Sequence, residues 1–516
     1  MREKPLKNTK MNILQSPKPI KITLGGVRIM SKIQEAAQEI AQKIGEEKVS
    51  TQKFHRMAYS RDWSPRNAKE AQLPDLVVVP STTEEVAEIV KIAYKNKIPI
   101  VPFAGGTGMG GGASPIKGGI TIDTKGLNKV LEIDKENLTV TTQVGITVLT
   151  LNQELEKHGL WWPHDPESKP ASTVGAAISC DNDSTFGIKY GKLVDYLLNA
   201  VIVTGTGEIL RVGHRKALCT SSGYKLHWLL IGAEGTLGVV TEATLKVFPK
   251  PQTRAVEAAV FKSISEAINT LQKLLQAGLS VESAHINCRN RLGFYTHAYR
   301  EKHGKEPDIP EWAEALLFVS FNGDEEVVNF AHEYALKILE KSGGAKVKER
   351  EITDGWWTSK HTLQFQPFKQ KWPDSQRKKK FGAADLGIPI GRIEEAYQKF
   401  LQIAEKNQIE ILGMCVYNER PNRISPSISF AVFVDDTNPD EIKRFYKYVE
   451  EMSKMAVDLG GTMSTYIGDG DRLGGFNEYE HGEALKYMKK IKEVFDPANI
   501  MNPGKKFESR WIKPEK

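Results

Sequence analysis

Six glycines lie between Gly105 and Gly112, within the stretch VPFAGGTGMGGGASPIKGGITID. The backbone N–H groups of such a loop can surround a diphosphate, because no side chains stand in the way. Gly106, Gly108 and Gly111 also satisfy the G-x-G-x-x-G spacing of a dinucleotide-binding loop, but that loop needs a helix after its third glycine. Pro115 and Gly118 break the chain instead. The sequence therefore predicts a phosphate cradle outside a Rossmann unit, with a flexible hinge as the alternative.

Four spaced segments carry a family resemblance. They are PFAGGTGMGGGASPIKGGITIDTKGLNKVLEID, SKPASTVGAAISCDNDSTFGIKYGKLVDYLLNAVIVTGTGEIL, SSGYKLHWLLIGAEGTLGVVTEATLKVFPKP and VFDPANIMNPGK. In this order they resemble flavoproteins of the vanillyl-alcohol oxidase and p-cresol methylhydroxylase superfamily, and most of all its D-lactate dehydrogenase and glycolate oxidase branch. The resemblance implies FAD and an oxidoreductase that moves a hydride to flavin N5 from a hydroxylated small molecule, such as lactate, glycolate or a related alcohol.

The resemblance also implies which residues contact the cofactor. The glycine loop would hold the diphosphate, the second segment the flavin side, the third the adenosine end, and the C-terminal segment the isoalloxazine ring. The residues implied are Gly105, Gly106, Thr107, Gly108, Gly111, Ser172, Thr173, Val174, Gly175, Tyr190, Gly191, Gly235, Gly238, Val240 and Asn502. Taken alone, Gly235 and Gly238 equally indicate a turn, and Asn502 a helix stop.

Covalent attachment of FAD is a further property of some relatives. They tether the cofactor through a histidine in the glycine loop and a cysteine in the second segment, where this chain has Thr107 and Ala171. A double covalent bond is therefore not expected. A single attachment elsewhere stays open.

Two stretches that bind a metal and accept a proton in the 2-hydroxy-acid branch have changed here. The first, His-x-Gly-Asp-Gly-Asn, is replaced by GMCVYNERPNRISPSISF, and the second has Tyr466 and Ile467 where the relatives have Glu and His. No His/Glu set with ligand spacing remains at either stretch, so no metal is predicted. We expect Tyr417, Arg420 and Tyr466 to face the substrate, with the arginine fork binding a carboxylate or phosphate. Alternatively, these three residues lie on surface loops.

A third stretch, WWTSKH, resembles a Trp-x-x-Arg segment near the active site of relatives. Trp357 and Lys360 would then clamp a carboxylate, but Trp356 and Trp357 equally fit a core. Two adjacent residues further along the chain, Glu480 and His481, begin the last amphipathic stretch. We expect their side chains to face solvent.

The altered stretches leave other functions open. These are a phenolic-alcohol oxidase, a transferase similar to alkyl-dihydroxyacetone-phosphate synthase, and a non-catalytic flavin subunit of an electron-transfer complex. The four cysteines, Cys180, Cys219, Cys288 and Cys415, lie too far apart in sequence for a self-contained cluster. Electrons would therefore pass to oxygen, a quinone, a cytochrome or a separate iron–sulfur partner.

The elements that must position these residues follow from apolar periodicity. Residues 73–103 predict a strand, a capping box from Ser81 to Glu84, an amphipathic helix and a buried strand. Together with the resemblance, the pattern predicts an α+β protein. A two-subdomain PCMH-type FAD-binding domain precedes an α+β cap domain with an antiparallel sheet, and the C-terminal tail returns to the FAD domain. The predicted bounds are 1–50 for a tail and helix, 51–252 for the FAD-binding domain, 253–462 for the cap, and 463–516 for a segment completing the flavin site.

The amino-acid composition limits the classes of protein and the partners that remain possible. The 516 residues are 40% hydrophobic and 26% charged, as in ordinary multidomain proteins. A formal net charge of +7 is spread among interleaved acidic and basic residues, so nucleic acid is not an expected partner, and the run Arg377–Phe381 is expected to be an exposed loop. No apolar run approaches the roughly 20 residues of a membrane span. We expect a cytoplasmic protein, leave a homodimer open, and interpret residues 1–29 as a flexible tail or a mis-assigned start.

Overall fold

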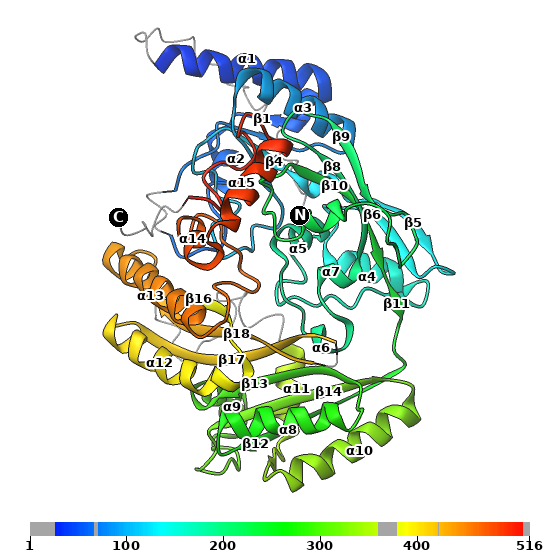
Figure 1. Ribbon diagram of the computed structural model, residues 1–516, viewed down its shortest axis with the longest axis vertical. Coiled ribbons are helices and arrows are strands. Elements are labelled where there is room, and N and C mark those ends of the chain that lie inside the picture. Colours follow the sequence, from blue (N-terminus) through cyan, green and yellow to red (C-terminus); the bar gives the residue numbers. More distant parts are fainter. Residues whose placement is uncertain (1–25, 67–70, 360–378, 422, 509–516) are drawn as a thin grey trace, which may run out of the picture.

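The computed structural model describes residues 26–66, 71–359, 379–421 and 423–508. Two smaller sheets with their helices form the upper half of the molecule in Figure 1, and a larger sheet with its own helices forms the lower half. Among the described residues, none of the helices combines the length and apolar character that a membrane span requires.

The first sheet positions the glycine loop and has the strand order β1-β2-β4-β3. Its strands are β1 (Val49–Ser50), β2 (Leu76–Val78), β3 (Ile100–Phe103) and β4 (Ile120–Asp123). The helices beside it are α1 (Gly26–Ile44), α2 (Lys53–Ala58) and α3 (Thr83–Asn96). Strands β3 and β4 are parallel, and residues 104–119 between them, all described, contain no helix. The prediction that no helix follows the glycine loop is confirmed.

Helix α3 begins one residue later than the sequence pattern predicted. The hydroxyl of Thr82 accepts from the backbone N–H of Glu85 at 3.1 Å, and the Glu85 side chain accepts from the N–H of Ser81 at 2.7 Å. The predicted capping box from Ser81 to Glu84 is therefore wrong by one position. Ser81 and Thr82 are both good caps with a glutamate three residues later, so the pattern alone could not choose between them.

The second sheet is antiparallel and has the order β5-β6-β10-β8-β9. Its strands are β5 (Val130–Asp134), β6 (Thr139–Gln143), β8 (Leu197–Val203), β9 (Ile209–Gly213) and β10 (Val239–Lys246). A short pair joins β7 (Leu160–Trp161) to β11 (Phe248–Pro249). The helices of this part are α4 (Val148–Glu156), α5 (Val174–Cys180), α6 (Gly187–Tyr190) and α7 (Leu193–Tyr196). Trp162 and Tyr196 are fully buried in its core.

The cap sheet is antiparallel, with the order β15-β12-β14-β13-β17-β18-β16. Its strands are β12 (Thr253–Phe261), β13 (Val281–Cys288), β14 (Ala315–Gly323), β15 (Ala345–Lys346), β16 (Lys380–Gly387), β17 (Glu410–Arg420) and β18 (Arg423–Val434). One face packs on α8 (Ile264–Gln276), α10 (Glu325–Lys341), α12 (Ile393–Lys406) and α13 (Pro439–Asp458). The other face carries α9 (Arg289–His303) and α11 (Arg350–Ser359).

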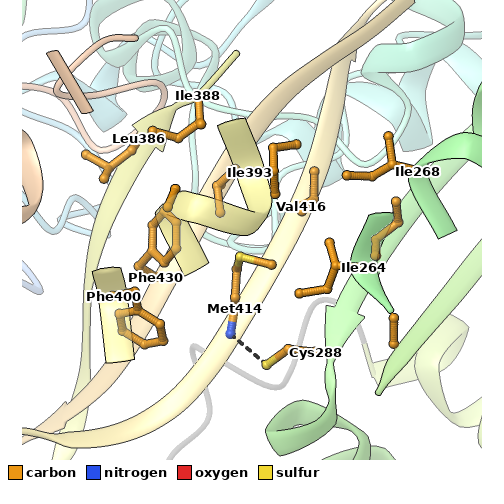
Figure 2. Packing of buried hydrophobic residues seen from close by; sticks show 14 of the residues in the cluster. Ile264, Ile268, Cys288, Leu386, Ile388, Ile393, Phe400, Met414, Val416 and Phe430 are labelled. Atoms are coloured by element: carbon orange, nitrogen blue, oxygen red, sulfur yellow. Dashed lines mark hydrogen bonds between the residues drawn. The ribbon is translucent and has the colours of Figure 1, made fainter. Parts of the chain in front are cut away.

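Strand alternation divides the cap residues between these two faces. Met414 and Val416 of β17 lie in the core shown in Figure 2, where the N–H of Met414 also donates to the Cys288 sulfur at 3.1 Å. Successive side chains of a strand point to opposite faces, so Cys415 and Tyr417 lie on the face away from this core. That face is the one turned toward the FAD-binding half.

The C-terminal segment crosses back to the first sheet, as the sequence predicted. It contains α14 (Asn477–His481) and α15 (Ala484–Phe495), drawn in red-orange in Figure 1. Beyond α15, the N–H of Ile100 donates to the carbonyl of Ile500 at 2.7 Å, and the N–H of Asn502 donates to the carbonyl of Ile100 at 2.7 Å. The last residues of the fold thus lie against β3.

The basic run Arg377–Phe381 differs from its predicted exposed loop in the part that the structure describes. Lys380 begins β16 and pairs with Asp436 at 2.6 Å, while Phe381 is buried. Lys379 lies 3.1 Å from Glu441. The prediction was wrong for these residues because carboxylates of the cap neutralise their charge, and charge density in the sequence does not show such partners.

Candidate active site

A cavity runs from the glycine loop to the open face of the cap sheet. Its empty volume is about 1280 Å³, with the open solvent at its mouth included. The predicted residues that line it are Gly105, Gly106, Thr107, Gly108, Ser172, Gly175, Gly235, Gly238, Val240, Tyr417 and Tyr466. The structure therefore brings most of the predicted cofactor residues and two of the three predicted substrate residues to one cavity.

Two glycines that line the cavity, Gly105 and Gly238, leave no room for a side chain. A Cβ on Gly105 would lie 2.2 Å from the carbonyl oxygen of Ala171, and one on Gly238 would lie 2.3 Å from the carbonyl oxygen of Val203. Gly238 also has a φ of 146°, in the region that favours glycine. Both positions are built so that backbone, and not side chain, forms the cavity wall. This arrangement suits an extended phosphate-bearing ligand.

Several predicted cofactor residues lie outside the cavity wall. Thr173 caps α5 by accepting from the N–H of Ala176 at 3.2 Å, and Val174 is buried in the core of the second sheet. Tyr190 donates to the side chain of Asn322 at 3.2 Å, and Gly191 packs against Asp195. These residues pack within the second segment, and Tyr190 connects it to the cap sheet through Asn322.

Gly111 and Asn502 fasten the glycine loop from behind. The carbonyl of Gly111 accepts from Lys505 Nζ at 2.7 Å, and a Cβ there would meet Asp471. The side-chain amide of Asn502 donates to the carbonyls of Gly112 at 2.8 Å and Glu234 at 2.7 Å. Asn502 thereby links the loop to the turn before β10.

The substrate end of the cavity contains two tyrosines and a glutamate. Tyr417 is 4% exposed, and its hydroxyl donates to Glu167 Oε1 at 3.3 Å. The ring of Tyr466 lies edge-on to that of Tyr417, with 6.1 Å between the ring centroids. Glu167 lies deep in the protein but keeps a partly exposed side that faces the cavity. Burial raises the pKa of Glu167 to about 7, against the opposing effects of Arg291 and Tyr417.

Tyr466 is presented by a loop that wraps around one buried carboxylate. Asp385 Oδ2 accepts from the N–H groups of Thr465, Tyr466 and Ile467 at 2.9, 3.0 and 2.8 Å. It also accepts from the Ser464 hydroxyl at 2.7 Å, and its other oxygen accepts from Arg472 at 2.8 Å. Because each bond to a carboxylate is charge-assisted, this network fixes the loop and the ring it carries.

Two other predicted residues, Arg420 and Trp357, do not line the cavity. Arg420 lies at the exposed end of β17 and is 3.4 Å from Asp195, as in its surface alternative. Trp357 lies against the guanidinium of Arg254, with 4.6 Å from its central carbon to the ring centroid. Trp356 stacks on Phe318 with 4.6 Å between the ring centroids, so it belongs to the cap core. Lys360 lies outside the described residues.

Sequence reasoning missed Glu167, Asp385 and Arg291. A signal existed for Asp385, since FGAADLGIPI places one carboxylate inside an apolar strand, and such a residue needs partners. Glu167 lies only five residues before the Ser172 segment, but nothing in the sequence relates it to Tyr417 250 positions later.

The donor set at this end does not match a metal site. One carboxylate and two phenols face each other, and within the described ranges no three His, Cys, Asp or Glu residues gather to hold a metal ion. The metal that the resemblance associates with the 2-hydroxy-acid branch therefore does not fit these residues.

A glycine-lined cavity that reaches a cap sheet is an arrangement that suits a nucleotide cofactor together with a small substrate. Residues 74–213 match the FAD binding domain family, and residues 250–506 match the C-terminal domain of FAD linked oxidases. The glycolate oxidase subunit GlcD of Bacillus subtilis is 30% identical over 474 residues, which are 91% of this chain and 96% of the relative. The chain belongs to the FAD-linked oxidase family. It is an FAD-dependent oxidoreductase.

Other relatives agree with this assignment. The probable mitochondrial D-lactate dehydrogenase of Danio rerio is 28% identical over 477 residues, or 90% of each chain. The 4-ethylphenol oxidase of Gulosibacter chungangensis has a TM-score of 0.75 at 17% identity and covers 93% of this chain and 98% of its own. A p-cresol methylhydroxylase has a TM-score of 0.74 at 19% identity, over 93% and 97%. The predicted resemblance and fold class are confirmed.

Proposed function

We propose that the protein removes a hydride from the carbinol carbon of a small hydroxylated substrate, a 2-hydroxy acid such as lactate or glycolate or a related alcohol. The observation that carries the proposal is the single cavity that joins the glycine cradle to Tyr417 and Tyr466. The relatives named as a glycolate oxidase subunit and D-lactate dehydrogenases support the substrate class.

The residues of the cavity fit FAD, because glycines line it and a Cβ at Gly105 or Gly238 would collide with a backbone carbonyl. We propose that Gly105, Gly106, Thr107 and Gly108 hold the diphosphate, Ser172 and Gly175 the flavin side, and Gly235, Gly238 and Val240 the adenosine end. Gly111, Thr173, Val174, Tyr190, Gly191 and Asn502 would support these contacts from behind. When bound, FAD supplies a two-electron acceptor for the hydride.

Tyr417 and Tyr466 would orient the substrate hydroxyl from the cap side, since their rings meet edge-on at the end of the cavity. Their hydroxyls both donate and accept hydrogen bonds, as an alcohol requires. The cap sheet would cover the reacting carbon and keep water away from it. The division into residues 51–252, 253–462 and 463–516 remains the domain scheme that we propose for these tasks.

A neutral or phenolic alcohol is the second candidate substrate. The ionisable groups along the described cavity wall are Asp62, Cys180, Glu167, Asp183, Glu234, Tyr417 and Tyr466. This acidic and phenolic lining suits a hydroxyl-bearing neutral molecule better than an anion.

Anaerobic titration of the FAD-loaded protein tests the proposal. Lactate, glycolate, longer 2-hydroxy acids, benzylic alcohols and alkylphenols are added in turn, and flavin absorbance is recorded. We expect bleaching by members of one of these classes. A protein that holds FAD but is bleached by none would contradict the proposal and favour a non-catalytic flavin subunit.

Admission of oxygen to the reduced protein then assigns the electron acceptor. Fast recovery of the flavin absorbance indicates an oxidase, while slow recovery indicates a quinone, cytochrome or iron–sulfur partner. We further propose a cytoplasmic location, supported by four free cysteines, which are typical of reducing compartments. Cell fractionation with an antibody to the protein checks it.

A further inference from the structure

We propose that Glu167 is the catalytic base that takes the proton of the substrate hydroxyl, with Tyr417 as the relay and Arg291 as a positioning residue. The proposal rests on the proposed function and adds the residue that accepts the proton. In the 2-hydroxy-acid branch a histidine takes the proton, and this chain has Ile467 at that position. We propose that Glu167, which lines the same cavity, takes its place.

The geometry of the cavity separates Glu167 from two other carboxylates that line it. Asp62 accepts from the N–H of Ser64 at 3.1 Å and from its hydroxyl at 2.6 Å, so it holds the chain beside the glycine loop. Glu234 accepts from the N–H groups of Asp469 and Gly470, both at 2.8 Å. Both carboxylates accept from backbone N–H groups, and the hydroxyl that Asp62 binds belongs to Ser64, which does not line the cavity. Glu167 instead accepts from the hydroxyl of Tyr417, a group that can itself exchange a proton.

The second layer around this pair comes from the cap domain. Tyr417 and Cys415 share one face of β17. Burial raises the pKa values of Glu167, Tyr417 and Cys415, and the positive charge of the buried Arg291 on α9 opposes this rise. His285 of β13 lies edge-on to the Tyr417 ring, with 4.8 Å between the centroids. Burial raises the pKa values of Tyr295 and Tyr466, and the negative charge of Glu167 contributes to both rises. A buried guanidinium behind the phenol would hold Tyr417 in place and favour negative charge on the pair.

Burial raises the pKa of Glu167 to about 7, which suits a base that works near neutral pH. The carboxylate form accepts the proton, and this form grows as the pH rises through about 7. The rate of substrate oxidation should therefore increase with pH across this range. Burial also raises the pKa of Tyr417 well above its ordinary value, so the phenol stays protonated and acts as a relay.

The proposed step is balanced in protons and electrons. The C–H bond of the carbinol breaks, and its hydrogen leaves with both bonding electrons to FAD. The O–H bond breaks as Tyr417 accepts that proton and gives its own to the Glu167 carboxylate. The carbon–oxygen double bond forms from the electron pair of the O–H bond. The alcohol is oxidised by two electrons, FAD is reduced by two, and Glu167 ends protonated.

Stopped-flow reduction of the FAD-loaded variants tests this role. We expect Glu167→Gln to slow flavin reduction by about 10²- to 10⁴-fold and to remove the rise with pH near 7, since a general base typically contributes that much. Tyr417→Phe should slow it by a comparable factor, because the phenol is the path by which the proton reaches Glu167. Tyr448→Phe is the matched control: Tyr448 is a buried cap tyrosine that donates to the carbonyl of Phe430, and its rate should match the parent.

Infrared titration of the protein without FAD supplies a readout that does not depend on turnover. We expect a protonated carboxylic-acid band that disappears with a midpoint near pH 7 and is absent from Glu167→Gln. Folding of that variant is checked by circular dichroism, and Glu167→Asp, which keeps the carboxylate, should restore part of the band.

The outcomes distinguish the two proposals. A parent protein that is bleached by substrate, together with an unaltered Glu167→Gln, would overturn the role of Glu167 alone. The same holds if Asp183→Asn, and not Glu167→Gln, removes the pH dependence, or if no band titrates near pH 7. A parent that holds FAD but is never bleached would overturn the proposed function and, with it, the base.

Discussion

At the scale of single residues, the cavity depends on glycines that allow two backbone segments to touch. Gly105 and Ala171 come from different segments, yet the wall between them has room for no methyl group. Gly105→Ala should therefore push the glycine loop away from the Ala171 segment. We expect FAD affinity to fall at least tenfold while the far-ultraviolet circular dichroism stays unchanged, because the affected contact lies at the cofactor. Flavin content after gel filtration and a fluorescence titration measure the change.

Gly391→Ala is the control for this variant. A Cβ at Gly391 meets no atom within 4 Å, so the same added methyl group should leave FAD binding intact. Equal FAD affinity in Gly105→Ala and Gly391→Ala would mean that the Gly105 contact does not shape the cradle.

The residue types in the sequence predicted the glycine-lined part of the cavity better than the residues proposed to take part in the reaction. Glycine spacing is a local signal, so Gly105 to Gly108 could be predicted to face one ligand. Arg420 was chosen for its fork, but it lies at the exposed end of a strand and pairs with Asp195. Glu167 was missed because its importance comes from Tyr417, a partner that only the fold brings near.

At the scale of elements, the loop with Tyr466 is held by a strand of the cap sheet. Asp385 of β16 accepts hydrogen bonds from three consecutive N–H groups of that loop and forms an ion pair with Arg472. Asp385→Asn removes the charge, and an amide can accept fewer of these bonds. We expect a loss of about 3 kcal/mol in the free energy of unfolding, typical of breaking a buried ion pair, and slower flavin reduction through a misplaced Tyr466. Urea denaturation and stopped-flow reduction measure both.

Asp354→Asn provides the comparison for this loss. Asp354 pairs with Arg350 on an exposed turn of α11, with 61% of its side chain exposed. Surface pairs contribute about 0 to 1 kcal/mol, so this variant should resemble the parent protein. If Asp385→Asn were equally mild, the loop would be held by its own packing.

The elements themselves were largely predictable, and their ends less so. Apolar periodicity predicted the helix after β2 and the antiparallel cap sheet, because burial of one face leaves a regular pattern. The cap of α3 was misplaced by one residue, since Ser81 and Thr82 offer equivalent hydrogen bonds. The pairing of β16 with β18 and the loop around Asp385 depend on residues far apart in sequence, which periodicity does not report.

At the scale of the whole molecule, the C-terminal segment ties the cofactor half to the rest of the chain. Met501 is fully buried in the core of the first sheet and pairs with Ile100. Met501→Ala should cost about 2 to 5 kcal/mol of unfolding free energy. Because Asn502 follows directly and holds the glycine loop, FAD release should shift to lower urea together with unfolding. Flavin fluorescence and circular dichroism, recorded in one titration, check this coupling.

Met488→Ala serves as the control on α15, where the methionine is 36% exposed. It should leave both transitions within about 0.5 kcal/mol of the parent, as surface substitutions usually do. A shift in unfolding without a shift in FAD release for Met501→Ala would show that the tail stabilises the sheet but not the cradle.

The position of Asn502 has a consequence for how the protein is made. Its amide closes the glycine loop from a point 390 residues further along the chain. At about 5 to 20 residues per second, a ribosome needs on the order of 20 to 80 s to travel that distance. During this time the nascent loop lacks the hydrogen bond from Asn502, so FAD should be captured only after that residue has been made. Flavin loading would then report that translation has passed Asn502, and chains released before that residue would stay colourless.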